Sequence, residues 1–239
     1  MTWLFLIVVT PLLTLLGYFL KIPWLLPLLQ VLPAYPLMVR DLKTRRWELA
    51  VLRMLLWAAL IGSTVEVLAL LSPASGEISI FHGKAYRDEM LLWIRTGIGK
   101  ESSPLHFLPE HAFHLALFVI LSLVSGGLLS LVLGAVLMNY MSFYVGSLLG
   151  IARLPWVVLL YGWPPWALLR VVAFVILGVV LSAPLLERLA GGPLVMERKR
   201  IWVLAAGAGL MLDVTLKTML APHWSAMLRS ALYSLSPGL

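Results

Sequence analysis

Residues 111–152 read HAFHLALFVILSLVSGGLLSLVLGAVLMNYMSFYVGSLLGIA, a run of 42 positions that contains no Asp, Glu, Lys or Arg. A helix needs about 20 apolar residues to cross the hydrocarbon of a bilayer, so this run is long enough for two crossings. Asn139 is its only strongly polar break, which predicts one span over 110–138 and the next over 140–163. The chain is therefore expected to be a helical membrane protein.

The composition of the whole chain agrees with this interpretation. Hydrophobic residues make up 61% and charged residues only 12%, whereas a soluble domain carries about 25% charged residues. The net charge is +7, but the basic residues cluster beside apolar segments, which indicates membrane topology and not nucleic-acid binding. The chain has no cysteine, which excludes disulfides, iron–sulfur clusters and thiol catalysis by its own residues.

Five other apolar segments are predicted to be spans: 2–20, 22–39, 47–72, 166–186 and 201–221. The first of them lacks a basic n-region and an A-x-A-like cleavage site, so we expect a retained span and not a signal peptide. The expected fold class is all-α, a polytopic transmembrane helix bundle that forms a single integral membrane domain over 1–239.

The segment 22–39 leaves two span counts open. It contains Pro23, Pro27, Pro33 and Pro36, and each proline removes a backbone donor and kinks a helix. Such breaks are tolerated in lipid where neighbouring groups satisfy the freed carbonyls. The segment is therefore either a kinked span, which makes seven spans in total, or a re-entrant pair of half-helices, which makes six.

The charges outside the spans predict the orientation. The segments 40–46 (RDLKTRR) and 187–200 (ERLAGGPLVMERKR) are basic, whereas 73–109 has four basic and four acidic residues. The positive-inside tendency places both basic segments in the cytoplasm and makes 73–109 an outer-side loop of the cell's inner (plasma) membrane. Within this loop, Tyr86 and Met90 recur at helical spacing, which predicts a short amphipathic helix on the membrane surface.

The candidate catalytic residues lie in HFLPEHAFH at 106–114. Pro109 suits the first position of a helix, and at 100° per residue Glu110, His111 and His114 then share one face. A carboxylate and imidazoles on one face can transfer protons, so these three residues are predicted to be catalytic.

The same stretch is also a candidate metal site. His106, His111 and His114, with the carboxylate beside them, are a competent ligand set for a divalent metal such as zinc. The spacing does not match His-Glu-x-x-His, in which the histidines are four apart. A polar collar that hydrogen-bonds water and lipid headgroups is the simpler alternative, and haem ligation is a third.

Polar residues inside the predicted spans are candidates for substrate binding, because buried charges usually face a bundle interior or a wet cavity. They are Glu66, Asn139, Arg153, Asp213 and Lys217. Asp213 and Lys217 are four apart and are expected to form a local ion pair, with the lysine reaching outward. Arg153 is mid-span in this segmentation, and Glu66 or Asp213 would have to be its partner.

Small residues recur every four positions at Gly126, Ser130 and Gly134, and again at Gly146 and Gly150. This spacing favours close helix packing over a hinge or a ligand cleft.

The segment MNYMSFY, 138–144, is expected to be an interfacial aromatic cluster at a cytoplasmic turn. The alternative is that it forms a polar lining for a headgroup or a small solute.

Three kinds of function are compatible with these features. The first is a membrane-embedded enzyme, a hydrolase or transferase that uses the His/Glu cluster on a lipid-linked or membrane-peptide substrate, with or without a metal. The second is a transporter or channel for a small solute or ion, with the buried charges along its path. The third is a non-catalytic membrane subunit. The expected partner is the lipid bilayer and not nucleic acid, and a homo-oligomer is left open because a pore would need one.

Overall fold

The computed structural model describes residues 2–190 and 199–233, and this part of the chain contains helices and no strand. The long helices are α1 Thr2–Leu20, α2 Leu25–Lys43, α3 Trp47–Leu71, α6 Pro104–Ser125, α7 Leu128–Ile151, α9 Pro165–Ala190 and α10 Lys199–Leu232. Shorter elements lie between them: α4 Pro73–Ser79, α5 Gly83–Thr96, η1 Lys100–Ser102 and α8 Pro155–Tyr161.

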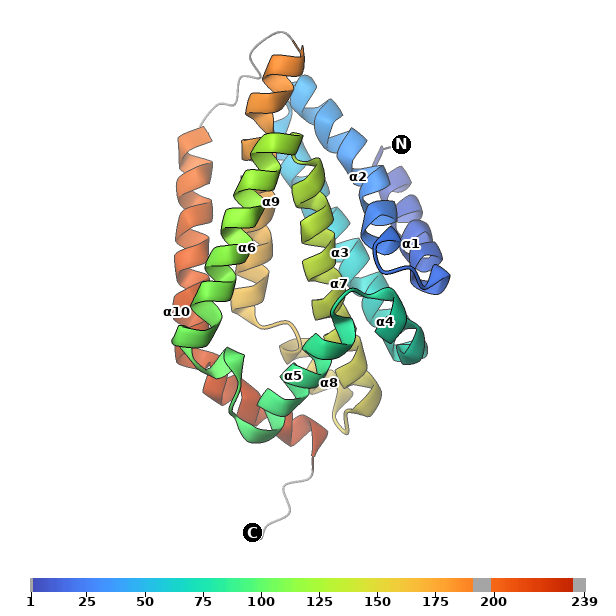
Figure 1. The fold of residues 1–239 in the computed structure, drawn as a ribbon, viewed down its shortest axis with the longest axis vertical. Coiled ribbons are helices and arrows are strands. Elements are labelled where there is room, and N and C mark those ends of the chain that lie inside the picture. Colours follow the sequence, from blue (N-terminus) through green and yellow to red (C-terminus); the bar gives the residue numbers. More distant parts are fainter. Residues whose placement is uncertain (1, 191–198, 234–239) are drawn as a thin grey trace.

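The long helices run up and down in one bundle, with α4, α5 and α8 at its lower end (Figure 1). Six of the long helices are long and apolar enough to cross a membrane, and α2 is the exception. Large apolar side chains such as Leu4 on α1 and Leu204 on α10 are exposed, as a surface that faces lipid requires. The predicted class, a helical membrane protein, is therefore shown.

The predicted boundary at Asn139 is wrong, because α6 ends at Ser125 and α7 begins at Leu128. Gly126 and Gly127 form the turn with φ of 58° and 90°, a left-handed backbone that glycine adopts without a steric penalty. Asn139 lies in the middle of α7, where its side chain and that of Gln30 exchange two hydrogen bonds of 2.8 Å. A polar amide does not have to end a helix when it finds such a partner.

Arg153 does not lie mid-span, which corrects the segmentation at the end of α7. The helix ends at Ile151, and Arg153 is an exposed residue of the connection to α8. Its backbone N–H donates to the carbonyl of Ala231 at 3.0 Å, while its side chain needs no buried partner. Neither Glu66 nor Asp213 pairs with it.

Two other helix boundaries also differ from the prediction. The stretch 22–39 is not a re-entrant pair, because α2 is one helix that contains Pro33 and Pro36. Helix α10 continues beyond the predicted end at residue 221, and its last part changes direction and lies beneath the bundle (Figure 1). Pro222 lies inside α10, and proline is a common cause of a bend in a helix.

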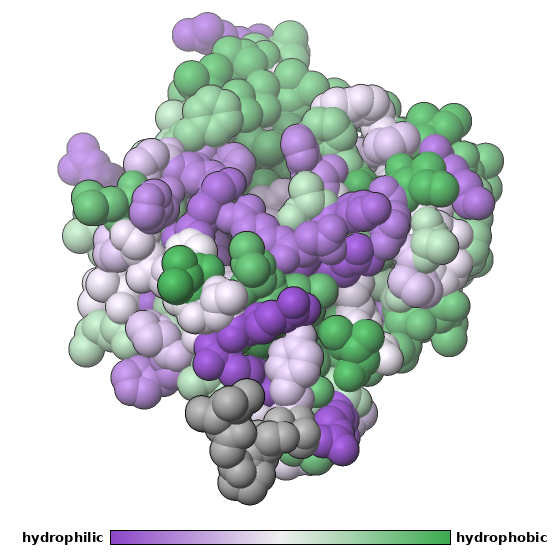
Figure 2. All heavy atoms as spheres, turned by 60° about the horizontal axis from the view of Figure 1, so that its bottom comes forward, coloured by the Kyte–Doolittle hydropathy of each residue, from purple (hydrophilic) through white to green (hydrophobic). Residues whose placement is uncertain are grey.

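The predicted amphipathic helix is confirmed as α5. Met90, Trp93 and Ile94 are buried, whereas Lys84 and Asp88 are exposed. Figure 2 brings this end of the molecule forward and shows hydrophilic side chains gathered over it. The basic connection between α2 and α3 lies at the opposite end of the bundle (Figure 1); residues 191–198 of the second basic segment lie outside the described part. Which end faces the cytoplasm remains a prediction.

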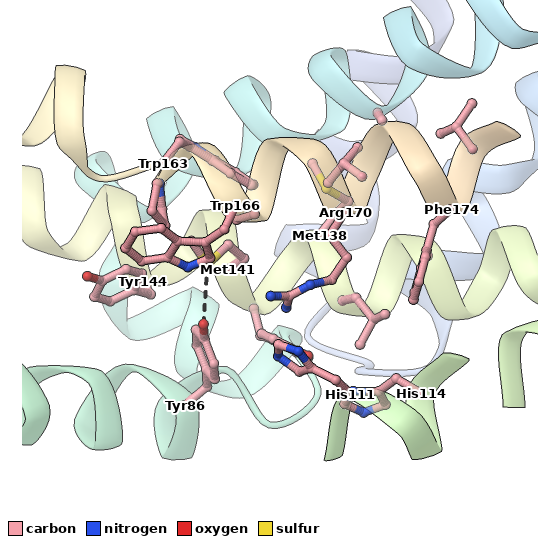
Figure 3. Close-up of a pocket in the computed structure, with 18 of the residues that line it drawn as sticks. Tyr86, His111, His114, Met138, Met141, Tyr144, Trp163, Trp166, Arg170 and Phe174 are labelled. Carbon is pink, nitrogen blue, oxygen red and sulfur yellow. Dashed lines mark hydrogen bonds between the residues drawn. The ribbon is translucent and has the colours of Figure 1, made fainter. Parts of the chain in front are cut away.

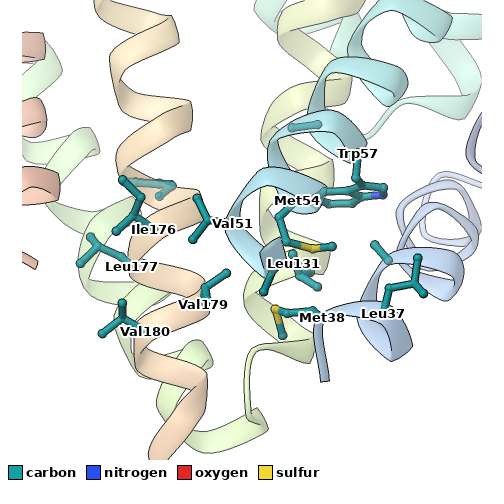
Figure 4. Packing of buried hydrophobic residues seen from close by; sticks show 14 of the residues in the cluster. Leu37, Met38, Val51, Met54, Trp57, Leu131, Ile176, Leu177, Val179 and Val180 are labelled. Atoms are coloured by element: carbon teal, nitrogen blue, oxygen red, sulfur yellow. The ribbon is translucent and has the colours of Figure 1, made fainter. Parts of the chain in front are cut away.

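The largest apolar core joins α2, α3, α7 and α9 (Figure 4). Trp57 is 2% exposed and donates from its indole nitrogen to the Gln30 carbonyl at 2.8 Å. Gly146 confirms close packing, since a Cβ there would lie 2.7 Å from the Cβ of Ala69 on α3. This core holds the two sides of the bundle together and leaves space between α6, α7 and α9.

Candidate functional site

That space is a cavity with a volume of about 150 Å³, which we call the chamber (Figure 3). Its walls come from α3, α5, α6, α7 and α9, together with the end of α10. Its lining combines apolar side chains, such as those of Phe118, Leu131 and Phe174, with the polar side chains of His111, His114 and Arg170. A mostly apolar cavity with a few polar groups is the usual form of a ligand site.

All three predicted catalytic residues line the chamber. His111 and His114 are half-buried residues of α6 that line it. Glu110 lies at its rim, where 48% of its side chain is exposed and its carboxylate is 3.7 Å from Lys100. The negative charges of Glu110 and then of Glu89 raise the pKa of Lys100 above its ordinary value. Glu110 is therefore engaged in a surface ion pair.

Pro109 does not start this helix, which corrects the predicted N-terminus. Helix α6 begins at Pro104, and Pro109 lies inside it. Glu110 is therefore in the second turn and not the first. The shared face of His111 and His114 does not depend on the helix start, because their spacing of three residues is unchanged.

His106 does not join the other histidines. Its side chain is exposed and does not line the chamber. Within the described residues, no group of three or more His, Asp or Glu side chains could hold a metal ion. The zinc site at His106, His111 and His114 thus stays a prediction to which this arrangement adds no support.

Lys217 is buried behind His111 and is not snorkelling, which corrects the prediction of an ion pair with Asp213. Only 1% of its side chain is exposed, and its ammonium is 2.7 Å from the Glu101 carboxylate. The ammonium also lies 3.3 Å from Nε2 of His111 and 4.3 Å from the ring centroid of Phe107. Asp213 and Lys217 are four residues apart on α10, as the prediction required. Each of them nevertheless forms its ion pair with another element, Asp213 with Arg170 and Lys217 with Glu101.

The partner of Asp213 is Arg170. The guanidinium donates through Nε and Nη2 to the two carboxylate oxygens, each at 2.8 Å. Arg170 lines the chamber, whereas Asp213 lies behind it on α10 and is not part of the lining. The pair keeps the guanidinium charged and oriented within an otherwise apolar wall.

The other predicted buried polar residues do not converge on one path. Glu66 accepts a hydrogen bond from the indole nitrogen of Trp163, which lines the chamber. Asn139 bonds to α2 and does not line the chamber. Arg153 is exposed at the end of α7. Among the predicted residues, the structure thus brings Glu110, His111 and His114 together at the chamber, with Lys217 and Asp213 directly behind the lining.

The segment 138–144 is not at a turn, which corrects the first interpretation and favours the second. It is the middle of α7, and Tyr140, Met141 and Tyr144 line the chamber. Figure 3 shows Tyr86 of α5 facing Met141, with 3.3 Å between the hydroxyl and the sulfur.

Gly134 also lines the chamber, and no atom lies within 4 Å of a Cβ built there. Its small size leaves room for a ligand and does not serve packing.

One wall of the chamber contains none of the predicted site residues. Trp163, Trp166, Arg170 and Phe174 line it from the start of α9 and the turn before it. Their spacing of three, four and four residues is that of one helical face, and a charge among aromatic residues at this spacing was the available signal. Tryptophans near the end of a span are also typical of an interfacial anchor, so the composition alone does not identify this wall.

Comparisons with known proteins do not assign this chain to a family. No protein-family model matches the sequence, and neither the curated proteins nor the solved structures provide a significant match. The function has to be argued from the chamber itself.

Proposed function

We propose that this protein is a membrane-embedded enzyme, a hydrolase or transferase, that acts on a lipid-linked substrate inside the chamber. The observation that carries the proposal is one cavity whose lining combines the polar groups of His111, His114 and Arg170 with apolar side chains such as Phe118 and Phe174. An amphiphilic molecule matches such a lining, because its head and its tail each find suitable contacts.

His114 is the proposed acid–base group. Its imidazole lines the chamber and forms no hydrogen bond with any other described residue. A positioned histidine that transfers a proton typically contributes a factor of about 10² to 10⁴ to a rate. Arg170, held by Asp213, would stabilise negative charge that develops on the substrate, and its low-dielectric surroundings strengthen that effect.

The enzyme is better supported than the transporter alternative. A transport path needs polar groups along the length of a bundle. Here Glu66, Arg153 and Asn139 occupy three separate places. Under the predicted orientation, the part of the chamber that borders α5 lies near the outer leaflet.

His114→Asn tests the proposal. The purified protein is incubated in vesicles that contain phosphatidylglycerol, diacylglycerol, a polyprenyl phosphate or an acylated peptide, and lipid products are identified by mass spectrometry. We expect a product with the natural chain and a rate lower by a factor of about 10² or more with His114→Asn. His106→Asn, on the same helix but exposed and outside the chamber, is the matched control and should retain the full rate.

Two results would contradict the proposal. One is an unchanged rate with His114→Asn in a variant that remains folded. The other is flux of a solute across the same vesicles without any change in their lipids, which would favour the transporter.

A further inference from the structure

We infer that the head of the substrate is a phosphate-type anion, held between the Arg170 guanidinium and the Nδ1–H of a neutral His111. This inference rests on the proposed function and specifies the class of lipid-linked substrate. It depends on which polar atoms at the chamber already have a hydrogen-bond or ion-pair partner and which are free to bind a ligand.

Lys217 determines the tautomer of His111. An ammonium group can only donate hydrogen bonds, and the Glu101 carboxylate at 2.7 Å with the Phe107 ring at 4.3 Å keeps this one charged. Its Nζ lies 3.3 Å from Nε2 of His111, so that nitrogen has to be the acceptor. The ring proton is therefore on Nδ1, since a neutral imidazole has one donor and one acceptor nitrogen.

Two donors at the chamber are buried and unpaired. Nδ1 of His111 and Nε1 of Trp93 have no hydrogen-bond partner among the described residues. Trp93 is 2% exposed and lines the chamber together with His111. A buried donor without a partner is unfavourable unless something binds it, and both residues line the same cavity.

Arg170 adds a third, charged donor. Its Nε and Nη2 bond to Asp213, and Nη1 has no hydrogen bond within the described residues. Figure 3 shows the guanidinium directed toward His111. Asp213 lies behind the arginine and not in the chamber, so the group that neutralises Arg170 does not cover the face it presents to a ligand.

The two carboxylates that line the chamber already have cationic partners. Glu101 binds Lys217 at 2.7 Å, and Glu110 lies 3.7 Å from Lys100. The charged donor that remains free in the lining is Arg170, and it matches a ligand that offers acceptors and a negative charge. A phosphate offers several acceptor oxygens and pairs well with arginine. An amine head would be repelled by Arg170 and Lys217, and a neutral sugar head would not provide a charged partner for Arg170.

Native mass spectrometry in a nonionic detergent tests the inference with amphiphiles that share one tail. We expect hexadecyl phosphate to bind one per chain and about tenfold or more tighter than hexadecanol, as a charge-assisted hydrogen bond implies. Arg170→Gln should remove this preference. Arg153→Gln, which changes an exposed arginine outside the chamber, should keep it.

Arg170→Gln leaves a buried carboxylate without its partner, so the double variant Arg170→Gln with Asp213→Asn provides a neutral pair for the same measurement.

Nitrogen NMR of His111 gives an independent readout. We expect the Nδ1–H tautomer in the natural chain and a loss of that bias in Lys217→Gln.

The outcomes separate this inference from the proposed function. Equal binding of hexadecanol or hexadecanoate, or an Nε2–H tautomer of His111, overturns the phosphate head but leaves a lipid-linked substrate in place. If no amphiphile binds, the proposed function itself fails.

Discussion

Two arginine–aspartate pairs join neighbouring helices of this bundle, and they have different surroundings. Arg53 of α3 binds Asp41 of α2 at 2.5 Å, with 7% and 4% of the two side chains exposed. Arg170 of α9 binds Asp213 of α10 at 2.8 Å, with 28% and 3% exposed. The aspartates are equally buried, so the difference lies in what each arginine faces.

Arg53 is enclosed on its remaining sides. Its Nη2 donates to the Thr2 hydroxyl at 2.7 Å, and the Trp3 ring centroid lies 5.2 Å from its guanidinium carbon. Arg170 instead lines the chamber, and 28% of its side chain is exposed. An arginine–aspartate pair that is enclosed by packing joins two helices. A pair of the same kind beside a cavity also offers the charge of its arginine to a ligand. The position of a pair beside open volume identifies it as a candidate for function.

Asp41→Asn should have the largest effect on stability. It leaves the buried Arg53 charge without its counter-charge, which typically costs about 3–5 kcal/mol. We expect a fall of that size in the free energy of unfolding in detergent micelles, and little change in the turnover of the folded fraction. Asp88→Asn, at an exposed position of α5, is the control and should change the stability little. A small effect of Asp41→Asn would show that the enclosed pair does not hold α2 to α3.

Asp213→Asn should have an intermediate effect, because Arg170 can be hydrated from the chamber when its counter-charge is removed. A loss of about 1.5–3 kcal/mol is expected, the range for a hydrogen bond to a charged group. Parallel unfolding curves for the two variants measure the difference. If Asp213→Asn destabilised as much as Asp41→Asn, the chamber would not be accessible to water at Arg170.

Gly134→Leu should have the smallest effect on stability and a large one on function. No atom lies within 4 Å of a Cβ at Gly134 or at Gly207, but only Gly134 lines the chamber. Both substitutions to Leu should stay within about 1 kcal/mol of the natural chain, since each adds a good helix former in open space. Binding of hexadecyl phosphate should weaken about tenfold or more with Gly134→Leu through steric exclusion. Gly207→Leu should leave it unchanged, and equal binding by both variants would show that no ligand occupies the chamber.

The sequence by itself determined the class of the protein and most of its helices. The apolar runs at 2–20 and 47–72 are helices with almost the predicted bounds, and the periodic segment at 84–96 is α5. The shared face of His111 and His114 was also predictable. All of these depend on local properties, namely the length of an apolar run and the angle between successive side chains.

Only the tertiary structure decided which polar groups meet. The sequence suggested Asp213 and Lys217 as partners because they are four apart, but Arg170 and Glu101 take those places. Asn139 was expected to end a helix, and Gln30, 109 positions away, allows it to stay inside one. A polar group in an apolar bundle is stable wherever it finds a partner. The partner is chosen by how distant helices pack, which the local sequence does not record.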